Sequence, residues 1–133
     1  MQENRIRAEI DASDPRQRDL AALFSAIDAQ DPAAFTSFLT DDASFRFGSA
    51  PAVRGKADIE AAVTEFFSQL AGLSHVLNTV VAKDAMLFCE GETTYTRHDG
   101  KAVVVPFADV FEYEGGKIAD YRIYADLAPL FAE

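Results

Sequence analysis

The sequence is poor in the residues on which disulfide scaffolds and metal centres depend. It contains one cysteine, Cys89, and two histidines, His75 and His98. A single cysteine cannot form an intramolecular disulfide, and no Cys/His spacing is typical of zinc. No glycine-rich phosphate loop precedes a helix, which argues against nucleotides. We therefore expect neither a metal nor an organic cofactor.

Positively charged residues and long apolar runs are also scarce. Lys and Arg total 12 against 22 Asp and Glu, so the formal net charge is −10. Because nucleic-acid affinity comes largely from clustered cations, we expect no nucleic-acid partner. The longest apolar runs are far shorter than a membrane span, and residues 1–10 lack the apolar region of a signal peptide. These absences predict a soluble cytoplasmic protein with no membrane partner.

The chain does contain enough apolar material for a core. Its 133 residues fit one domain, and 49% of them are hydrophobic, including 11 Phe and 4 Tyr. This composition argues against a mainly disordered chain. Residues 1–13 are polar, with Ile6 and Ile10 as the apolar anchors. We expect residues 1–13 to form a flexible N-terminal tail, or a short helix that docks on a neighbour, and residues 14–133 to form a single domain.

Three helices are expected in the first half of the chain. Asp14 before Pro15 and Asp31 before Pro32 are typical helix starts, because the Asp side chain caps the helix and proline fits its first turn. A third helix follows residues 56–58, and Gly72 is placed to end it. Apolar residues recur at helical spacing along the three segments: Leu20, Leu23, Phe24 and Ile27; Phe35, Phe38 and Leu39; Ile59, Val63, Phe66, Phe67 and Leu70.

After Gly72 the apolar period changes to about two, which is typical of strands. Four segments show it: residues 74–82, 85–97, 102–113 and 118–125. The short breaks between them fit tight hairpins and antiparallel neighbours, and a short strand at residues 45–47 joins the sheet. The predicted fold is α+β, with a cone-shaped, curved antiparallel sheet of about five strands packed on three N-terminal helices. Its apolar interior is a pocket by geometry.

The order of several short motifs resembles the SnoaL-like branch of the nuclear-transport-factor-2-like superfamily. The resemblance covers roughly residues 14–131, and six segments carry it: AIDAQD at 26–31, LTDDASF at 39–45, VRGKADI at 53–59, ADVFEY at 108–113, GKI at 116–118 and YRIYADL at 121–127. It implies the NTF2-like fold described above. It does not select a reaction, because the superfamily holds isomerases, dehydratases, epoxide hydrolases, cyclases and non-catalytic binders.

The steroid-isomerase-like branch is matched at one catalytic position of three. Its members use a Tyr on the first helix, a carboxylate base after the second helix and a protonated Asp in the third long strand. Asp109 matches the last of these. The base position holds Phe47, and the Tyr position is apolar, at Leu23 or Phe24. The resemblance therefore argues against that isomerisation by that mechanism.

Other branches are matched in part as well. Epoxide-hydrolase-like members need an Asp–Arg–Asp set that holds water, and only Glu92 keeps a carboxylate here. Ile123 occupies the position of the second Asp, where aldol cyclases also place their acid/base Asp. Scytalone-dehydratase-like members carry a pocket His early in the first long strand, which His75 matches, while His98 is offset from their second His.

Strand alternation assigns the candidate residues to faces. Phe107, Asp109 and Phe111 share one face of their strand, so that Asp109 lies between two aromatic rings if this face lines the cavity. Such a carboxyl loses hydration, and we expect a raised pKa. By analogy with the family, the face of the preceding strand that carries Glu90, Glu92 and Thr94 also looks inward, although Gly91 is a possible bulge.

These residues suggest acid/base chemistry. Asp109 would donate a proton or hydrogen bond, with His75 or Glu92 as the paired base, in the isomerisation, dehydration or cyclisation of a small apolar carbonyl or hydroxyl compound. Seven apolar residues are expected to line the pocket: Phe24, Phe45, Phe47, Phe67, Phe107, Phe111 and Ile123.

The alternative is a non-catalytic module that binds a hydrophobic small molecule or only dimerises. In this superfamily the convex side of the sheet commonly packs against a second copy. Here that side would carry an apolar set suited to a homodimer interface: Thr93, Tyr95, Val110 and Tyr124.

Overall fold

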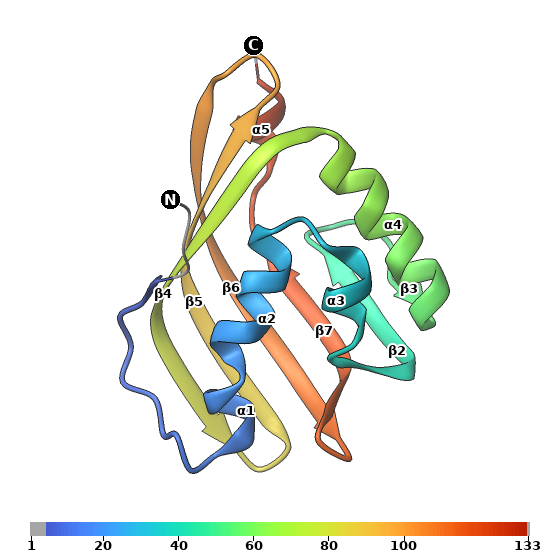
Figure 1. Cartoon of the computed structure of the whole chain (residues 1–133), viewed down its shortest axis with the longest axis vertical. Helices are drawn as coiled ribbons and strands as arrows, with labels where there is room; N and C mark the ends of the chain where they lie inside the picture. Colours follow the sequence, from blue (N-terminus) through green and yellow to red (C-terminus); the bar gives the residue numbers. More distant parts are fainter. Residues whose placement is uncertain (1–4, 133) are drawn as a thin grey trace.

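The computed structural model of the chain describes residues 5–132 (Figure 1). It is an α+β fold, as predicted. The helices are α1 (Pro15–Arg18), α2 (Leu20–Asp28), α3 (Pro32–Thr36), α4 (Lys56–Ser68) and α5 (Ala128–Phe131). None of the helices found between residues 5 and 132 is long and apolar enough to cross a membrane.

Both Asp–Pro pairs start helices, as predicted. The side chain of Asp14 accepts a hydrogen bond from the backbone N–H of Arg16, and that of Asp31 accepts one from Ala34. The first predicted helix is divided at Asp19, where α1 ends and α2 begins.

The helix α4 ends earlier than the sequence predicted. Its C-cap is Gln69, and the strand β4 begins at Leu70. The prediction that Gly72 ends the helix is therefore wrong, because Gly72 lies inside β4. Leu70 continues the helical spacing of α4 and also faces the core from the strand, so periodicity alone does not separate the two elements. Leu39, predicted in the second helix, likewise begins a strand.

Seven strands form one sheet in the order β1-β4-β5-β6-β7-β2-β3. Their bounds are β1 (Arg5–Ile6), β2 (Leu39–Phe47), β3 (Val53–Arg54), β4 (Leu70–Lys83), β5 (Met86–Arg97), β6 (Ala102–Glu114) and β7 (Lys117–Tyr124). The predicted antiparallel run from β4 to β7 is confirmed. The sheet as a whole is mixed, however, because β2 pairs in parallel with β7 and β1 with β4. It is a curved sheet that stays open between its edge strands β1 and β3, rather than a closed barrel.

The segment expected to be a flexible tail is partly attached to the sheet. Arg5 and Ile6 pair with Val76 and Leu77 of β4. The backbone N–H groups of Arg7 and Ala8 then donate to the carbonyl of Leu77, at N–O distances of 2.8 and 3.3 Å. The part of the prediction that concerns residues 1–4 lies outside the described residues.

A bulge in β4 bends the sheet opposite Gly91. Leu77 pairs with Gly91 and Thr79 pairs with Glu90, so one extra residue of β4 is accommodated between them. A Cβ atom on Gly91 would lie 1.7 Å from the carbonyl oxygen of Val76. Gly91 is therefore required for the close approach of the two strands, and the predicted bulge lies in the partner strand.

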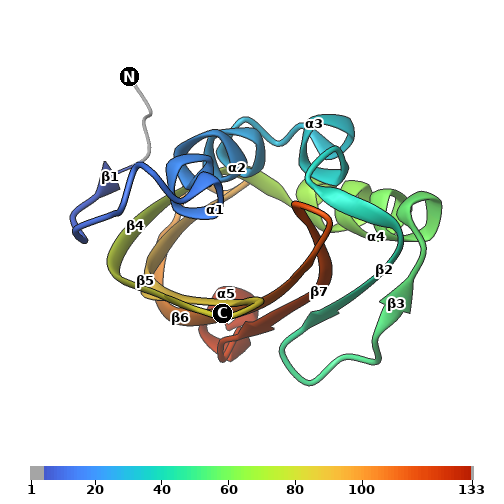
Figure 2. The same ribbon diagram turned by 90° about the horizontal axis from the view of Figure 1, so that it is seen from below.

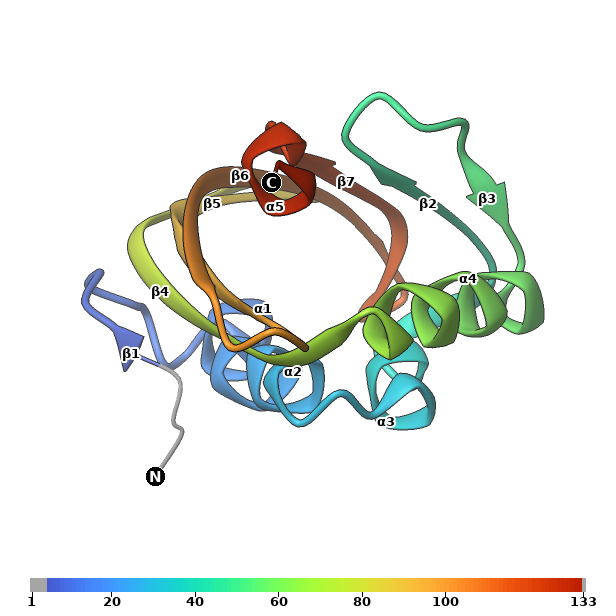
Figure 3. The ribbon, with the colours of Figure 1, turned by 90° about the horizontal axis from the view of Figure 1, so that it is seen from above.

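Figures 2 and 3 show the sheet bent into an arc, with α2, α3 and α4 along its open side. The buried residues of α2 and α4 face the concave side of the sheet, and alternate residues of β5 and β6 meet them there. The helices and the concave face together form the walls of the site described next.

Candidate functional site

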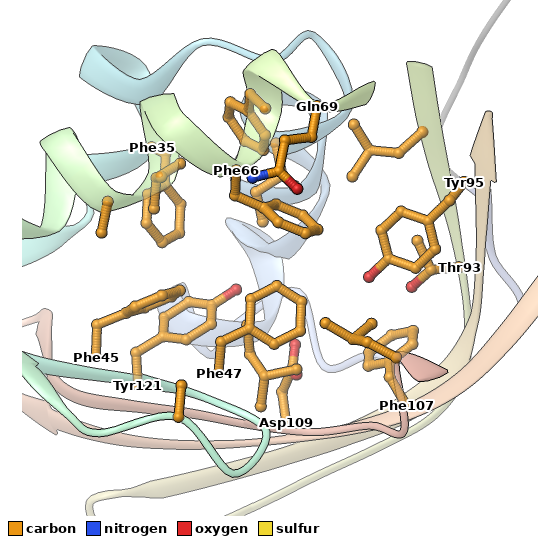
Figure 4. A pocket seen from close by; sticks show the side chains of 18 of the residues that line it. Phe35, Phe45, Phe47, Phe66, Gln69, Thr93, Tyr95, Phe107, Asp109 and Tyr121 are labelled. Atoms are coloured by element: carbon orange, nitrogen blue, oxygen red, sulfur yellow. The ribbon is translucent and has the colours of Figure 1, made fainter. Parts of the chain in front are cut away.

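The concave face of the sheet and the helices α2, α3 and α4 surround a cavity of about 340 Å³ (Figure 4). Most of its walls are aromatic or aliphatic. Six of the seven apolar residues predicted to line a pocket do line it: Phe24, Phe45, Phe47, Phe67, Phe107 and Ile123.

Phe111 is the exception. Its side chain is fully buried and packs against Tyr121, with ring centroids 4.3 Å apart, and against Tyr113 at 6.4 Å. It shares a strand face with Asp109, but it packs against these rings and does not line the cavity. Phe111 is therefore a core residue and not a wall of the cavity.

The predicted orientation of β5 is wrong. Thr93 and Tyr95 are buried and line the cavity, whereas Glu92 is exposed on the outer face. Directly paired residues of neighbouring strands point to the same side of a sheet. Because Cys89 pairs with Asp109, the inward face of β6 forces odd-numbered residues of β5 inward. Glu92 is thus separated from Asp109 by the sheet and cannot act as its paired base.

The same register corrects the expected outer face. Thr93 and Tyr95 do not belong to it, although Tyr124 does, being 50% exposed. The large apolar side chains that β5 and β6 do expose include Phe88 and Val104.

Asp109 lies in the cavity wall in an apolar setting. Asp109 is 3% exposed, and within residues 5–132 its Oδ1 atom has no hydrogen-bond partner. Burial raises the pKa of this carboxyl well above its usual value, because the charged form would lose its hydration. The predicted rise in pKa is confirmed. A carboxyl held in its neutral form can donate a hydrogen bond or a proton to a molecule in the cavity.

His75, also predicted, lines the cavity and is paired with a residue that sequence reasoning missed. Its Nδ1 lies 2.6 Å from Oδ1 of Asp28, and its backbone N–H donates to Asp28 Oδ2 at 3.1 Å. The ring contacts Phe24 and Phe107, with centroid distances of 4.9 and 5.4 Å. A carboxylate only accepts hydrogen bonds, so Nδ1 is the donor, and in the neutral imidazole Nε2 is left as the acceptor.

Asp28 is the last residue of α2, and its partner lies 47 positions later in β4. It falls within the segment 26–31 that carries the family resemblance, yet no local spacing relates it to His75. Only the packing of α2 against the sheet brings the pair together.

Hydroxyl groups and the amide of Gln69 add to the polar part of the cavity. Tyr95 and Thr93 project from β5 and Tyr121 from β7, as Figure 4 shows. Burial raises the pKa of Tyr95 to about 12, although a hydrogen bond with Thr93 opposes the rise. Burial also raises the pKa of Tyr121 well above its usual value. These phenols therefore stay neutral and can donate or accept hydrogen bonds at ordinary pH.

The remaining histidine lies elsewhere. His98 is exposed in the β5–β6 hairpin, where its Nε2 lies 2.9 Å from the carbonyl oxygen of Ser68. Among residues 5–132 there is no cluster of three or more His, Cys, Asp or Glu side chains that could hold a metal ion.

Several solved structures are similar to this one. A SnoaL-like polyketide cyclase candidate from Jannaschia sp. CCS1 is 20% identical, over 87% of this chain and 88% of its own, with a TM-score of 0.78. An LEH-like epoxide hydrolase from M. tuberculosis is 20% identical over 86% of this chain and 84% of its own, with a TM-score of 0.71. TerC, co-crystallised with polyporic acid, is 15% identical over 87% and 95%, with a TM-score of 0.77. At these identities the likeness shows the fold alone.

No curated protein sequence matches the chain. The SnoaL-like domain family matches residues 20–121, which is most of the chain and includes both the His75–Asp28 pair and Asp109. The chain belongs to the SnoaL-like domain family.

Proposed function

We propose that this protein binds a small, neutral, largely apolar carbonyl or hydroxyl compound in the cavity and moves a proton on it. The observation that carries the proposal is that two unlike groups line one apolar cavity. Asp109 is a buried acid with one oxygen that has no hydrogen-bond partner in the described part of the chain, and His75 is an imidazole held by a carboxylate. Pairs of titratable groups whose environments separate their roles are typical of acid/base sites.

The common step is enolisation. His75 Nε2 removes a proton from the carbon next to the carbonyl, the electrons of that C–H bond form the C=C bond, and the carbonyl oxygen takes the proton of Asp109. The product is an enol, with imidazolium at His75 and carboxylate at Asp109. Asp28 stabilises the imidazolium through its 2.6 Å contact with Nδ1. With a β,γ-unsaturated ketone the enol is a dienol. Return of the proton from His75 to its γ-carbon moves the C=C bond into conjugation with the carbonyl, and return of the enol proton to Asp109 completes an isomerisation.

The cavity favours an uncharged ligand. No Lys or Arg of the described chain lines it, and the whole protein carries a formal charge of −10. An anion would therefore lose its hydration without gaining a countercharge. The aromatic walls instead favour apolar ring systems. Solved relatives of this fold include a polyketide cyclase candidate and an epoxide hydrolase, which supports the fold as a scaffold for enzymes.

The test uses 2-tetralone, a neutral bicyclic ketone, in D₂O, with exchange of its α-hydrogens followed by NMR. We expect the wild-type protein to accelerate exchange. Asp109→Asn and His75→Gln should each slow it by about 100-fold or more, the usual contribution of one general acid or base. Glu92→Gln is the matched control, because Glu92 lies on the outer face. Exchange at the wild-type rate in both cavity variants would refute the assignment, and far-UV circular dichroism would verify that each variant is folded.

A non-catalytic binding protein is the second candidate, and one observation favours it. Asp28 accepts hydrogen bonds from both the ring and the backbone of His75, so the pair also fastens α2 to β4. A purely structural pair would leave a cavity that binds 2-tetralone saturably with no acceleration of exchange. An enzyme should instead give a bell-shaped pH–rate profile that Asp109→Asn changes on its alkaline side.

A further inference from the structure

Two rings from opposite walls meet across the cavity. Phe66 projects from α4 and Phe47 from β2, and Figure 4 shows the two side chains pointing toward one another. Their ring centroids are 5.0 Å apart with an interplanar angle of 63°, an edge-to-face contact. The ring centroids of Phe66 and Tyr95 are 6.1 Å apart, with an interplanar angle of 88°. The three rings therefore form a row from β2 past α4 to β5. We call Phe47 and Phe66 the aromatic neck.

The exposure of the lining residues falls from the rim of the cavity to the neck and again to the polar groups. Ala50, Pro51, Gln69 and Phe131 line the cavity and are exposed, so they mark its rim. Phe47 and Phe66 are half-buried. The acid and the base of the proposed chemistry are buried: His75 is 8% exposed and Asp109 is 3% exposed. From this order of exposure we infer that the path from the rim to Asp109 runs past the neck or between its rings.

We propose that the aromatic neck is the specificity determinant of the cavity, admitting planar molecules and rejecting globular ones of equal carbon content. The inference rests on the proposed function, since it concerns the same cavity. A flat ring can slide between the two phenylalanines and exchange their contact for offset or edge-to-face contacts at the usual 4.5–7 Å spacing. A globular hydrocarbon has no thin edge. It must displace both rings from the packed walls that hold them, which costs contact energy without replacing it.

Each half of the neck is held differently. Phe66 is one position before the buried Phe67, whose ring lies 6.4 Å away. Phe47 is the last residue of β2, packs on Phe45 at 6.5 Å and precedes Gly48, which has a φ of 60°. Both rings are half-buried, so truncation of either widens the cavity while the deeper aromatic core remains in place.

The test compares two probes with ten carbons and one hydroxyl each: planar 2-naphthol and globular 1-adamantanol. Their dissociation constants are measured by isothermal titration calorimetry for wild type, Phe66→Ala, Phe47→Ala and the control Phe88→Ala, whose ring lies on the outer face. We expect the wild-type protein to prefer 2-naphthol. Either neck variant should reduce this preference by at least about tenfold, the discrimination that a tight apolar fit usually gives, whereas Phe88→Ala should leave it unchanged.

The outcomes separate this inference from the proposed function. If both probes bind but the ratio of their dissociation constants is the same in all four proteins, the neck has no selective role, while the ligand cavity stands. If neither probe binds any of the proteins, the cavity is not a binding site and both proposals fail. Phe66→Leu, which keeps apolar volume in α4, should give an intermediate ratio. It guards against a loss of binding caused by unfolding of the alanine variant.

Discussion

The burial of Asp109 makes a specific prediction about stability and pH. In the unfolded chain this carboxyl titrates near its usual value of 3.8, whereas in the folded protein burial raises its pKa well above that. Above about pH 4 the unfolded state therefore loses a proton that the folded state keeps. The contribution of Asp109 to folding stability is therefore fully present only below the pKa of the unfolded state. It falls as pH rises from that pKa toward the higher pKa of the folded state.

The replacement Asp109→Asn removes this dependence, because an amide does not titrate but has nearly the same shape. Each pH unit between the two pKa values corresponds to about 1.36 kcal/mol per proton. The difference between the unfolding free energies of Asp109→Asn and wild type should therefore rise in favour of the variant. The rise is about 1.4 kcal/mol for every pH unit above about pH 4, up to the pKa of Asp109 in the folded protein. Hydrogen bonds made by the amide add an offset that does not vary with pH.

The measurement is urea unfolding of both proteins at several pH values between 4 and 8, with the difference in unfolding free energy plotted against pH. All other titrating groups are shared, so their effects largely cancel in this difference. Asp84→Asn makes the same chemical change at an exposed turn residue and serves as the control. A flat plot for Asp109→Asn would show that Asp109 is ionised in the folded protein, and the assignment of a neutral acid would then fail.

Three further predictions concern the sheet, an ion pair and the assembly. Gly91→Ala should destabilise the protein by about 3 kcal/mol or more in urea unfolding, because the new methyl group would meet the carbonyl of Val76 at 1.7 Å. Gly72→Ala, where the nearest atom is 3.9 Å away, should be tolerated, and equal effects would contradict the bulge argument. Hydrogen bonding to Arg16 lowers the pKa of Asp14 to about 2 from 3.8. The contribution of Asp14 to folding stability is therefore present above pH 3.8 and is lost as pH falls through about 2. Asp14→Asn keeps the helix cap but removes the titrating group, so its acid unfolding curve, followed by circular dichroism, should lack the loss of stability that Asp14 causes. Identical curves for the variant and wild type would contradict the predicted contribution of Asp14. The exposed Phe88, Val104 and Tyr124 predict a homodimer through the outer sheet face. Light scattering would detect the dimer as twice 14.5 kDa, and Val104→Lys should dissociate it. A wild-type mass of 14.5 kDa would rule the dimer out.

Local patterns predicted the elements well, and long-range register decided the site. The caps at Asp14 and Asp31 depend on neighbouring residues, and the antiparallel run from β4 to β7 depends on short hairpins, so both could be predicted. Alternation groups Phe107, Asp109 and Phe111 on one face of β6, but it does not say whether that face points inward, as the structure shows for Phe107 and Asp109. The predicted face of β5 rests on family analogy and is wrong. The short connection from Arg97 to Lys101 fixes which residues pair, and counting back from it sets Thr93 opposite Val105.

Other features have no local signal. The contact between Asp28 and His75 depends on how α2 is laid on the sheet, and the sequence between them gives no measure of it. The parallel pairing of β2 with β7 is of the same kind. Phe111 was misassigned for a different reason: alternation gives the side of the sheet, but not whether a residue packs against neighbouring rings or lines the cavity.

The pairing of β2 with β7 has a consequence for the order in which the protein takes shape during synthesis. Phe45 and Phe47 are set against Tyr121 and Ile123, residues that leave the ribosome more than seventy positions later. Strands joined by short hairpins can associate early, but contacts so distant in the chain form slowly and late. A nascent polypeptide ending before β7 would lack the partner that positions one wall, and a compound that recognises the finished chamber would have no effect on the earlier stages of folding.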